Sequence, residues 1–108
     1  MSERESFRAE PPTLLGSRDP ETGQIYFPPR ALAANGALTP CQDVDLSREG
    51  VLYSWTRMGD RYYGQVDLPE KVRIQGPLAP GDPEIGARYC LEAVAAKDGA
   101  VSWRFARA

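Results

Sequence analysis

The sequence predicts a mainly β protein in which a small closed barrel of five strands follows an N-terminal hairpin. Two observations support this. Five segments with alternating apolar and polar residues follow one another in the second half of the chain, separated by turn-forming residues. At 108 residues, 42% of them hydrophobic, the chain is long enough for one modest core but too short for a deep enclosed active site as well.

The first third of the chain predicts an arm and then a hairpin. Residues 1–15 mix charges with two adjacent prolines, so we expect an arm that gains order mainly by contact with something else. Residues 19–23, DPETG, are strong turn formers because proline presets φ and glycine accepts a positive φ. The strand-like residues 24–27 follow, and two further prolines end them.

The rest of the N-terminal half is expected to be a connector. Residues 31–50 contain few large apolar side chains and several turn-forming pairs, which indicates mostly irregular structure. We therefore divide the chain into an arm at 1–15, a ribbon-like segment at 16–48 and a barrel at 49–108.

The barrel strands are expected at residues 51–56, 62–68, 72–75, 87–96 and 101–106. On the first of them, simple alternation puts Val51, Tyr53 and Trp55 on one face. Asp98 and Gly99 mark a tight turn between the last two strands. A closed five-stranded barrel of this size is an OB-fold, which leaves one strand face and its loops for ligands.

Composition narrows the classes of function. Histidine is absent, so any catalysis would depend on carboxylates, Tyr, Lys, Arg or Cys. The 13 basic and 15 acidic residues give a net charge of −2 without a basic tail, which weighs against nucleic acid as a partner. Without an apolar span, and with only Cys41 and Cys90, a cytoplasmic protein with reduced thiols and no membrane association is expected.

Several short motifs, in this order and spacing, resemble one known family. They are Gly23-x-x-x-Phe27-Pro28-Pro29-Arg30, GVLYSWT at 50–56, QVDLP at 65–69 and Ile85-Gly86. The chain is similar over residues 14–107 to the zinc-ribbon OB-fold proteins known as domain of unknown function thirty-five. This resemblance implies a rubredoxin-like ribbon hairpin ahead of the barrel.

In that family four ribbon cysteines hold a structural zinc ion in a closed tetrahedral site. Asp19, Thr22 and, approximately, Ala33 and Gly36 occupy those places in this chain. Only Asp19 offers a donor, and Cys41 lies outside the expected spacing. The sequence therefore predicts a metal-free ribbon without a cofactor, in which local turn preference replaces the metal.

The resemblance also implies a function, because members of the family accompany thiolases, related aldolases and other acyl-CoA enzymes. We expect a non-catalytic accessory subunit that binds a thiolase-like or other acyl-CoA-processing enzyme and helps to hold its coenzyme A thioester. Partner contact is expected from Ile25, Tyr26, Phe27 and Arg30 on the hairpin, since apolar and aromatic groups anchor interfaces.

Three barrel residues are candidates for contact with coenzyme A. Arg57 and Arg73 can match phosphate oxygens, and Trp55 can belong to an aromatic platform of the kind that OB-folds use. The two arginines can equally belong to a solvated charged face, and Trp55 to the core. The core interpretation is stronger for Trp103 and Phe105.

Two alternative functions stay open at this point. One is an OB-fold module that binds single-stranded nucleic acid, against which the acidic balance weighs. The other is a small independent acyl-CoA enzyme. The sequence does not identify the partner, the acyl group or the pathway, and it leaves a homodimer open.

Overall fold

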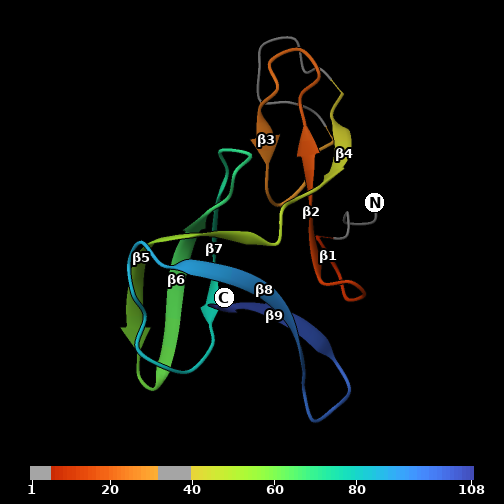
Figure 1. Ribbon diagram of the computed structural model, residues 1–108. Helices are drawn as coiled ribbons and strands as arrows, with labels where there is room; N and C mark the ends of the chain where they lie inside the picture. Colours follow the sequence, from red (N-terminus) through yellow and green to blue (C-terminus); the bar gives the residue numbers. More distant parts are fainter. Residues whose placement is uncertain (1–5, 32–39) are drawn as a thin grey trace.

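The computed structural model describes residues 6–31 and 40–108, in which the regular elements are strands (Figure 1). They are β1 (Phe7–Arg8), β2 (Thr13–Arg18), β3 (Ile25–Tyr26), β4 (Gln42–Asp45), β5 (Glu49–Met58), β6 (Arg61–Asp67), β7 (Arg73–Leu78), β8 (Arg88–Ala95) and β9 (Val101–Arg107). The first four form an N-terminal sheet, and the others close into a barrel in the order β5-β6-β7-β9-β8. The expected mainly β fold with a five-stranded barrel is confirmed. Within the described ranges, no helix has the length and apolar character that crossing a bilayer requires.

The N-terminal sheet is organised around β2. β3 and β4 both pair with it antiparallel, and β1 pairs with its beginning. Ser17 of β2 lies opposite Tyr26 of β3, so the hairpin around the DPETG turn is confirmed. β4 corrects part of the segment 31–50, for which the sequence predicts mostly irregular structure and of which residues 32–39 lie outside the described residues. Its pairing with β2 makes it a strand, whereas its own side-chain pattern gives little signal.

Residues 6–15 pack against the rest of the chain. Leu15 donates its backbone N–H to the carbonyl of Ser6 at 2.9 Å, and the side chain of Leu14 is completely buried in the core. This differs from the arm that the sequence predicts, because Leu14 supplies an apolar anchor just after the two prolines. Residues 1–5 of that arm lie outside the described residues.

The barrel is closed by two short contacts. β6 pairs along nearly its whole length with β5 and β7, and β8 pairs along its length with β9. β5 joins β8 at residues 49–51, and β7 meets β9 in parallel at Leu78 and Phe105. The ladder between β7 and β9 is therefore short, and side chains must fill the space beside it.

A bulge interrupts β5 at Tyr53. The register with β6 shifts between Leu52 and Ser54, so the strand gains one residue relative to its partner. Side chains beyond the bulge consequently change face. Trp55 comes to the same face as the buried Leu52, which corrects the grouping of Trp55 with Val51 that alternation predicts.

The N-terminal sheet and the barrel share one core. Its buried apolar side chains are Leu14, Leu46, Leu52, Val66, Leu68, Ile74, Leu78, Tyr89, Leu91 and Phe105. Trp103 lies over Gly76 of β7, where any Cβ would collide with the indole ring. The ring of Phe27 meets the indole edge to face at 6.2 Å between centroids, and Phe105 does so at 5.9 Å. Trp103 thus joins the hairpin to the barrel beside the short β7–β9 contact.

We expect Trp103→Ala to lower the free energy of unfolding by about 3 kcal/mol, because it removes the indole from between two rings and leaves a cavity. Val101→Ala on the same strand is the matched control. Its side chain is 48% exposed, so the change should stay within about 0.5 kcal/mol. Urea denaturation measures both, and a cost below about 1 kcal/mol for Trp103→Ala would contradict the linking role.

Candidate functional site

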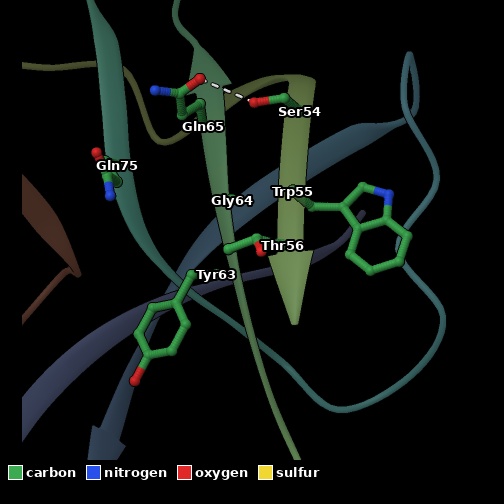
Figure 2. Close-up of a pocket in the computed structure, with 7 residues that line it drawn as sticks. All are labelled: Ser54, Trp55, Thr56, Tyr63, Gly64, Gln65 and Gln75. Carbon is green, nitrogen blue, oxygen red and sulfur yellow. Dashed lines mark hydrogen bonds between the residues drawn. The ribbon is translucent and has the colours of Figure 1, made fainter. Parts of the chain in front are cut away.

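The outer face of β5, β6 and β7 carries an uncharged row of polar side chains. Ser54, Gln65 and Gln75 lie opposite one another across the three strands. A hollow of about 250 Å³ surrounds this row (Figure 2), and the described residues that line it are Ser54, Trp55, Thr56, Tyr63, Gly64, Gln65 and Gln75. No charged side chain is among them. The ring of Trp55 points away from the hollow, so only its backbone contributes.

The polar groups of the hollow are mostly uncommitted. The Ser54 hydroxyl donates to Oε1 of Gln65 at 2.8 Å, which leaves the NH₂ group of that amide available. In Figure 2 this nitrogen points toward the β7 side, where Gln75 lies. Within the described part of the chain, the side chains of Thr56, Tyr63 and Gln75 have no hydrogen-bond partner. The arrangement can therefore bind a neutral polar ligand.

Sequence reasoning does not single out this row. Alternation alone could have placed Gln65 and Gln75 outward on their strands, because each is flanked by apolar residues or glycine. It could not have placed them opposite each other. The register of β6 on β7 depends on the turn between them and on the core, neither of which is visible as a motif.

Arg73, a predicted coenzyme A contact, lies on the same face of β7, two residues before Gln75. Its guanidinium donates to both carboxylate oxygens of Asp67, at 2.6 and 3.1 Å, and stacks over the ring of Tyr53 at 3.5 Å. The hydrogen bonds from Arg73 and, secondarily, its positive charge hold the pKa of Asp67 below its ordinary value of 3.8, whereas burial acts in the opposite direction. Arg73 is thus a positioned guanidinium next to the hollow, with its charge paired to the Asp67 carboxylate and N–H groups left over for a further acceptor.

Trp55 and Arg57, the other two predicted contacts, form a separate cluster with Tyr62. Trp55 meets the Tyr62 ring edge to face at 5.7 Å between centroids. The Arg57 guanidinium lies 5.9 Å from the centroid of the same ring, and its Nε donates to the carbonyl of Gly59 at 2.7 Å. Trp55 remains 41% exposed at this end of the barrel.

The structure does not bring Arg57 and Arg73 together. Across the sheet, Arg57 lies opposite Tyr62, which lies opposite Leu78 at the end of β7. Arg73 lies opposite Asp67, at the beginning of β7. The five residue steps from 73 to 78 separate these two cross-strand rows by about 17 Å along β7 and put them on opposite faces. The two arginines therefore cannot contact one phosphate group.

The four predicted partner-binding residues divide into two pairs. Ile25 and Phe27 are partly buried and pack against the core of this chain. Tyr26, which is also partly buried, and the exposed Arg30 contact each other, and the Arg30 guanidinium stacks over the Tyr26 ring at 5.1 Å. The backbone N–H of Arg30 donates to the buried Ser17 hydroxyl at 2.7 Å, which fixes the chain after the two prolines.

The turn at 19–23 is held by the side chain of Asp19, which is 1% exposed. Its carboxylate accepts hydrogen bonds from the backbone N–H of Glu21 and from the hydroxyl of Thr22, both at 2.9 Å. Its carbonyl accepts the N–H of Gly23, which has φ of 79°. Asp19 and Thr22 are the two residues at the first pair of family zinc positions, so a hydrogen bond joins them there. Ala33 and Gly36 lie outside the described residues.

The described residues contain no group of three Asp, Glu, His or Cys side chains that could hold a metal ion. Cys41 and Cys90 are both free thiols and are partly exposed. A second hollow of about 580 Å³ lies at the Tyr62 end of the barrel and includes Trp103 and Arg104 in its lining. Arg104 is already paired there with Glu92 at 3.0 Å.

We expect Asp19→Ala to lower the free energy of unfolding by about 2 kcal/mol, because the turn loses two buried acceptor interactions. Asp60→Ala, at an exposed turn of the barrel, should change it by less than about 0.5 kcal/mol. Urea denaturation compares them. EDTA should leave the melting temperature of the unmodified protein unchanged, and a drop would show that a metal holds the ribbon.

We expect Arg73→Gln to raise the pKa of Asp67 toward 3.8, measured by NMR titration of the carboxyl carbon. Since the pKa of Asp67 is lower in the folded chain, the unfolded chain takes up this proton first as the pH falls. The stabilisation by the pair is therefore present above about pH 4 and lost as the pH drops through the folded-state pKa. Arg57→Gln is the control, and an equal effect from it would contradict this assignment.

Comparison with known proteins supports the fold. No protein-family model matches the sequence, and no curated protein matches it. Among solved structures, the chain is similar to one described as "Ltp2-ChsH2(DUF35) aldolase", with a TM-score of 0.70 and 19% sequence identity over 88% of this chain and 84% of that chain. The chain thus has the fold of a protein whose description names the same domain of unknown function that its motifs resemble.

Proposed function

We propose that this chain is a non-catalytic accessory subunit that binds a thiolase-like or other acyl-CoA-processing enzyme. The observation that carries the proposal is the similarity over 88% of the chain to a structure described as an aldolase with a DUF35 component. The motif resemblance, which implies partnership with thiolases and related aldolases, points to the same class of enzyme.

Contacts in the hairpin support a docking surface there. Ile25 and Phe27 pack against the core and fix the hairpin on the barrel, so they position the surface. Tyr26 and Arg30 stack against each other and can meet a partner with little loss of side-chain freedom. In this proposal Tyr26 and Arg30 supply the partner contact.

Contacts on the barrel support a role in holding the coenzyme A thioester. Arg73 is held in place by Asp67 and Tyr53, and its N–H groups that Asp67 does not use can donate to a phosphate group. Trp55 and Arg57 lie at the other end of the barrel and would contact a different part of the complex. Arg73 is therefore the arginine that we assign to the substrate.

We expect an affinity-tagged chain, expressed in its native host, to co-purify with a thiolase-like or other acyl-CoA-processing enzyme in a fixed ratio. Tyr26→Ala combined with Arg30→Ala should lower the recovery of that enzyme about tenfold or more, because a stacked aromatic–arginine pair is a typical interface anchor. Mass spectrometry and quantitative gels measure both. Glu84→Ala with Arg107→Ala, an exposed ion pair on the barrel to which we assign no role, is the matched control.

Two results would overturn the proposal. One is that the purified chain alone turns over acyl-CoA thioesters. The other is that the co-purifying proteins include no acyl-CoA enzyme. Thermal melting of each variant shows whether a loss of recovery reflects a lost contact or a lost fold.

A further inference from the structure

The uncharged hollow on β5, β6 and β7 has the chemistry to recognise amide groups. A glutamine side chain offers one acceptor and two donors in a plane, which match the N–H and C=O of a secondary amide. Gln65 uses Oε1 for the Ser54 hydroxyl and keeps its NH₂ donor, and Gln75 keeps both functions. With no charged side chain among the described lining residues, the hollow gives no counter-charge to an ionic ligand.

The spacing between Gln65 and Gln75 indicates which kind of amide ligand fits the hollow. Gln65 and Gln75 are directly opposite on neighbouring strands, and such strands lie about 4.8 Å apart. Two amides separated by two methylene groups repeat about every 5 Å in an extended chain, from standard bond lengths. An extended α-peptide instead repeats about every 3.4 Å and turns successive amides in opposite directions. The glutamine pair therefore fits amides with a two-carbon spacer.

The position of Arg73 at the border of the hollow agrees with a ligand that carries such amides. Arg73 stands two residues from Gln75 on the same face of β7, at the end away from Tyr63. A neutral arm that ends in phosphate groups would lie with its arm in the hollow and its phosphates toward Arg73. The volume of about 250 Å³ suits a segment of such a ligand and is too small for all of it.

We propose that the hollow formed by Ser54, Gln65 and Gln75 binds the pantetheine arm of a coenzyme A thioester. The two amides of this arm are separated by two methylene groups. The Gln65 NH₂ group donates to the carbonyl of one amide, and Gln75 pairs with the other. This inference rests on the proposed function, since an acyl-CoA-processing partner supplies the thioester. It names the part of the substrate that this chain holds.

The test is a titration of the ¹⁵N-labelled full chain with pantetheine, kept reduced because both cysteines are free thiols. We expect saturable shifts in the side-chain NH₂ signals of Gln65 and Gln75, up to about 20 mM ligand, which covers a millimolar Kd. Adenosine 3′,5′-bisphosphate, the charged half of the coenzyme, should leave these two signals in place. Tetraglycine, whose amides have the α spacing, should do the same.

Variants separate specific binding from surface effects. Gln75→Leu should weaken pantetheine binding about tenfold, the effect of losing one well-made hydrogen-bond pair. Gln75 is exposed, so the fold should be retained. Gln42→Leu makes the same change on an exposed residue of β4 and should leave the affinity unchanged.

The proposal is overturned if pantetheine leaves both glutamine signals unchanged, if tetraglycine shifts them as strongly, or if Gln75→Leu binds as the unmodified chain does. The co-purification experiment tests the proposed function independently of pantetheine binding. If the acyl-CoA enzyme co-purifies but pantetheine does not bind, the pantetheine site is wrong and the accessory role stands. If pantetheine binds but no acyl-CoA enzyme co-purifies, the accessory role is wrong and the hollow still binds amides.

Discussion

The contact between Trp103 and Gly76 holds the two parts of this protein together. The barrel closes between β7 and β9 through one short parallel contact, and the indole of Trp103 fills the space beside it. The glycine allows the ring to lie against the backbone of β7, and Phe27 packs edge to face with the same ring. Core packing, hairpin placement and barrel closure therefore meet at one side chain, so the hairpin surface and the barrel face keep a fixed relation to each other.

The bulge at Tyr53 gives β5 two different surfaces. Tyr53, at the bulge itself, is exposed and lies under Arg73, and after the bulge Trp55 and Arg57 turn to the face of Tyr62. The bulge thus removes the largest aromatic ring from the outer face and leaves short polar side chains there. An unbroken alternation would instead place Trp55 on the outer face, beside the hollow.

The sequence predicts where the strands lie in the chain better than how they pair and which residues face each other. Alternation locates the barrel strands, and the DPETG turn locates the hairpin, because these signals are local. β4 escapes detection since its stability comes from pairing with β2, and Leu14 turns part of an expected arm into core. The bulge at Tyr53 has no local signature in the sequence, so alternation predicts the wrong face for Trp55. The separation of Arg57 from Arg73, and the facing glutamines Gln65 and Gln75, depend on register, which only the folded chain defines.

The turn at 19–23 is held by hydrogen bonds among its own residues, with the Asp19 carboxylate as acceptor and the Thr22 hydroxyl as one donor. A knuckle built on thiolates reaches its shape only when zinc is supplied and loses it when the sulfur atoms are oxidised. Here a carboxylate and a hydroxyl do the same work, and neither is sensitive to oxidants or chelators. This part of the hairpin can therefore form as soon as the chain leaves the ribosome. Oxidants and chelators act on neither group, so the hydrogen bonds of this turn do not depend on zinc supply or on the redox state of thiols.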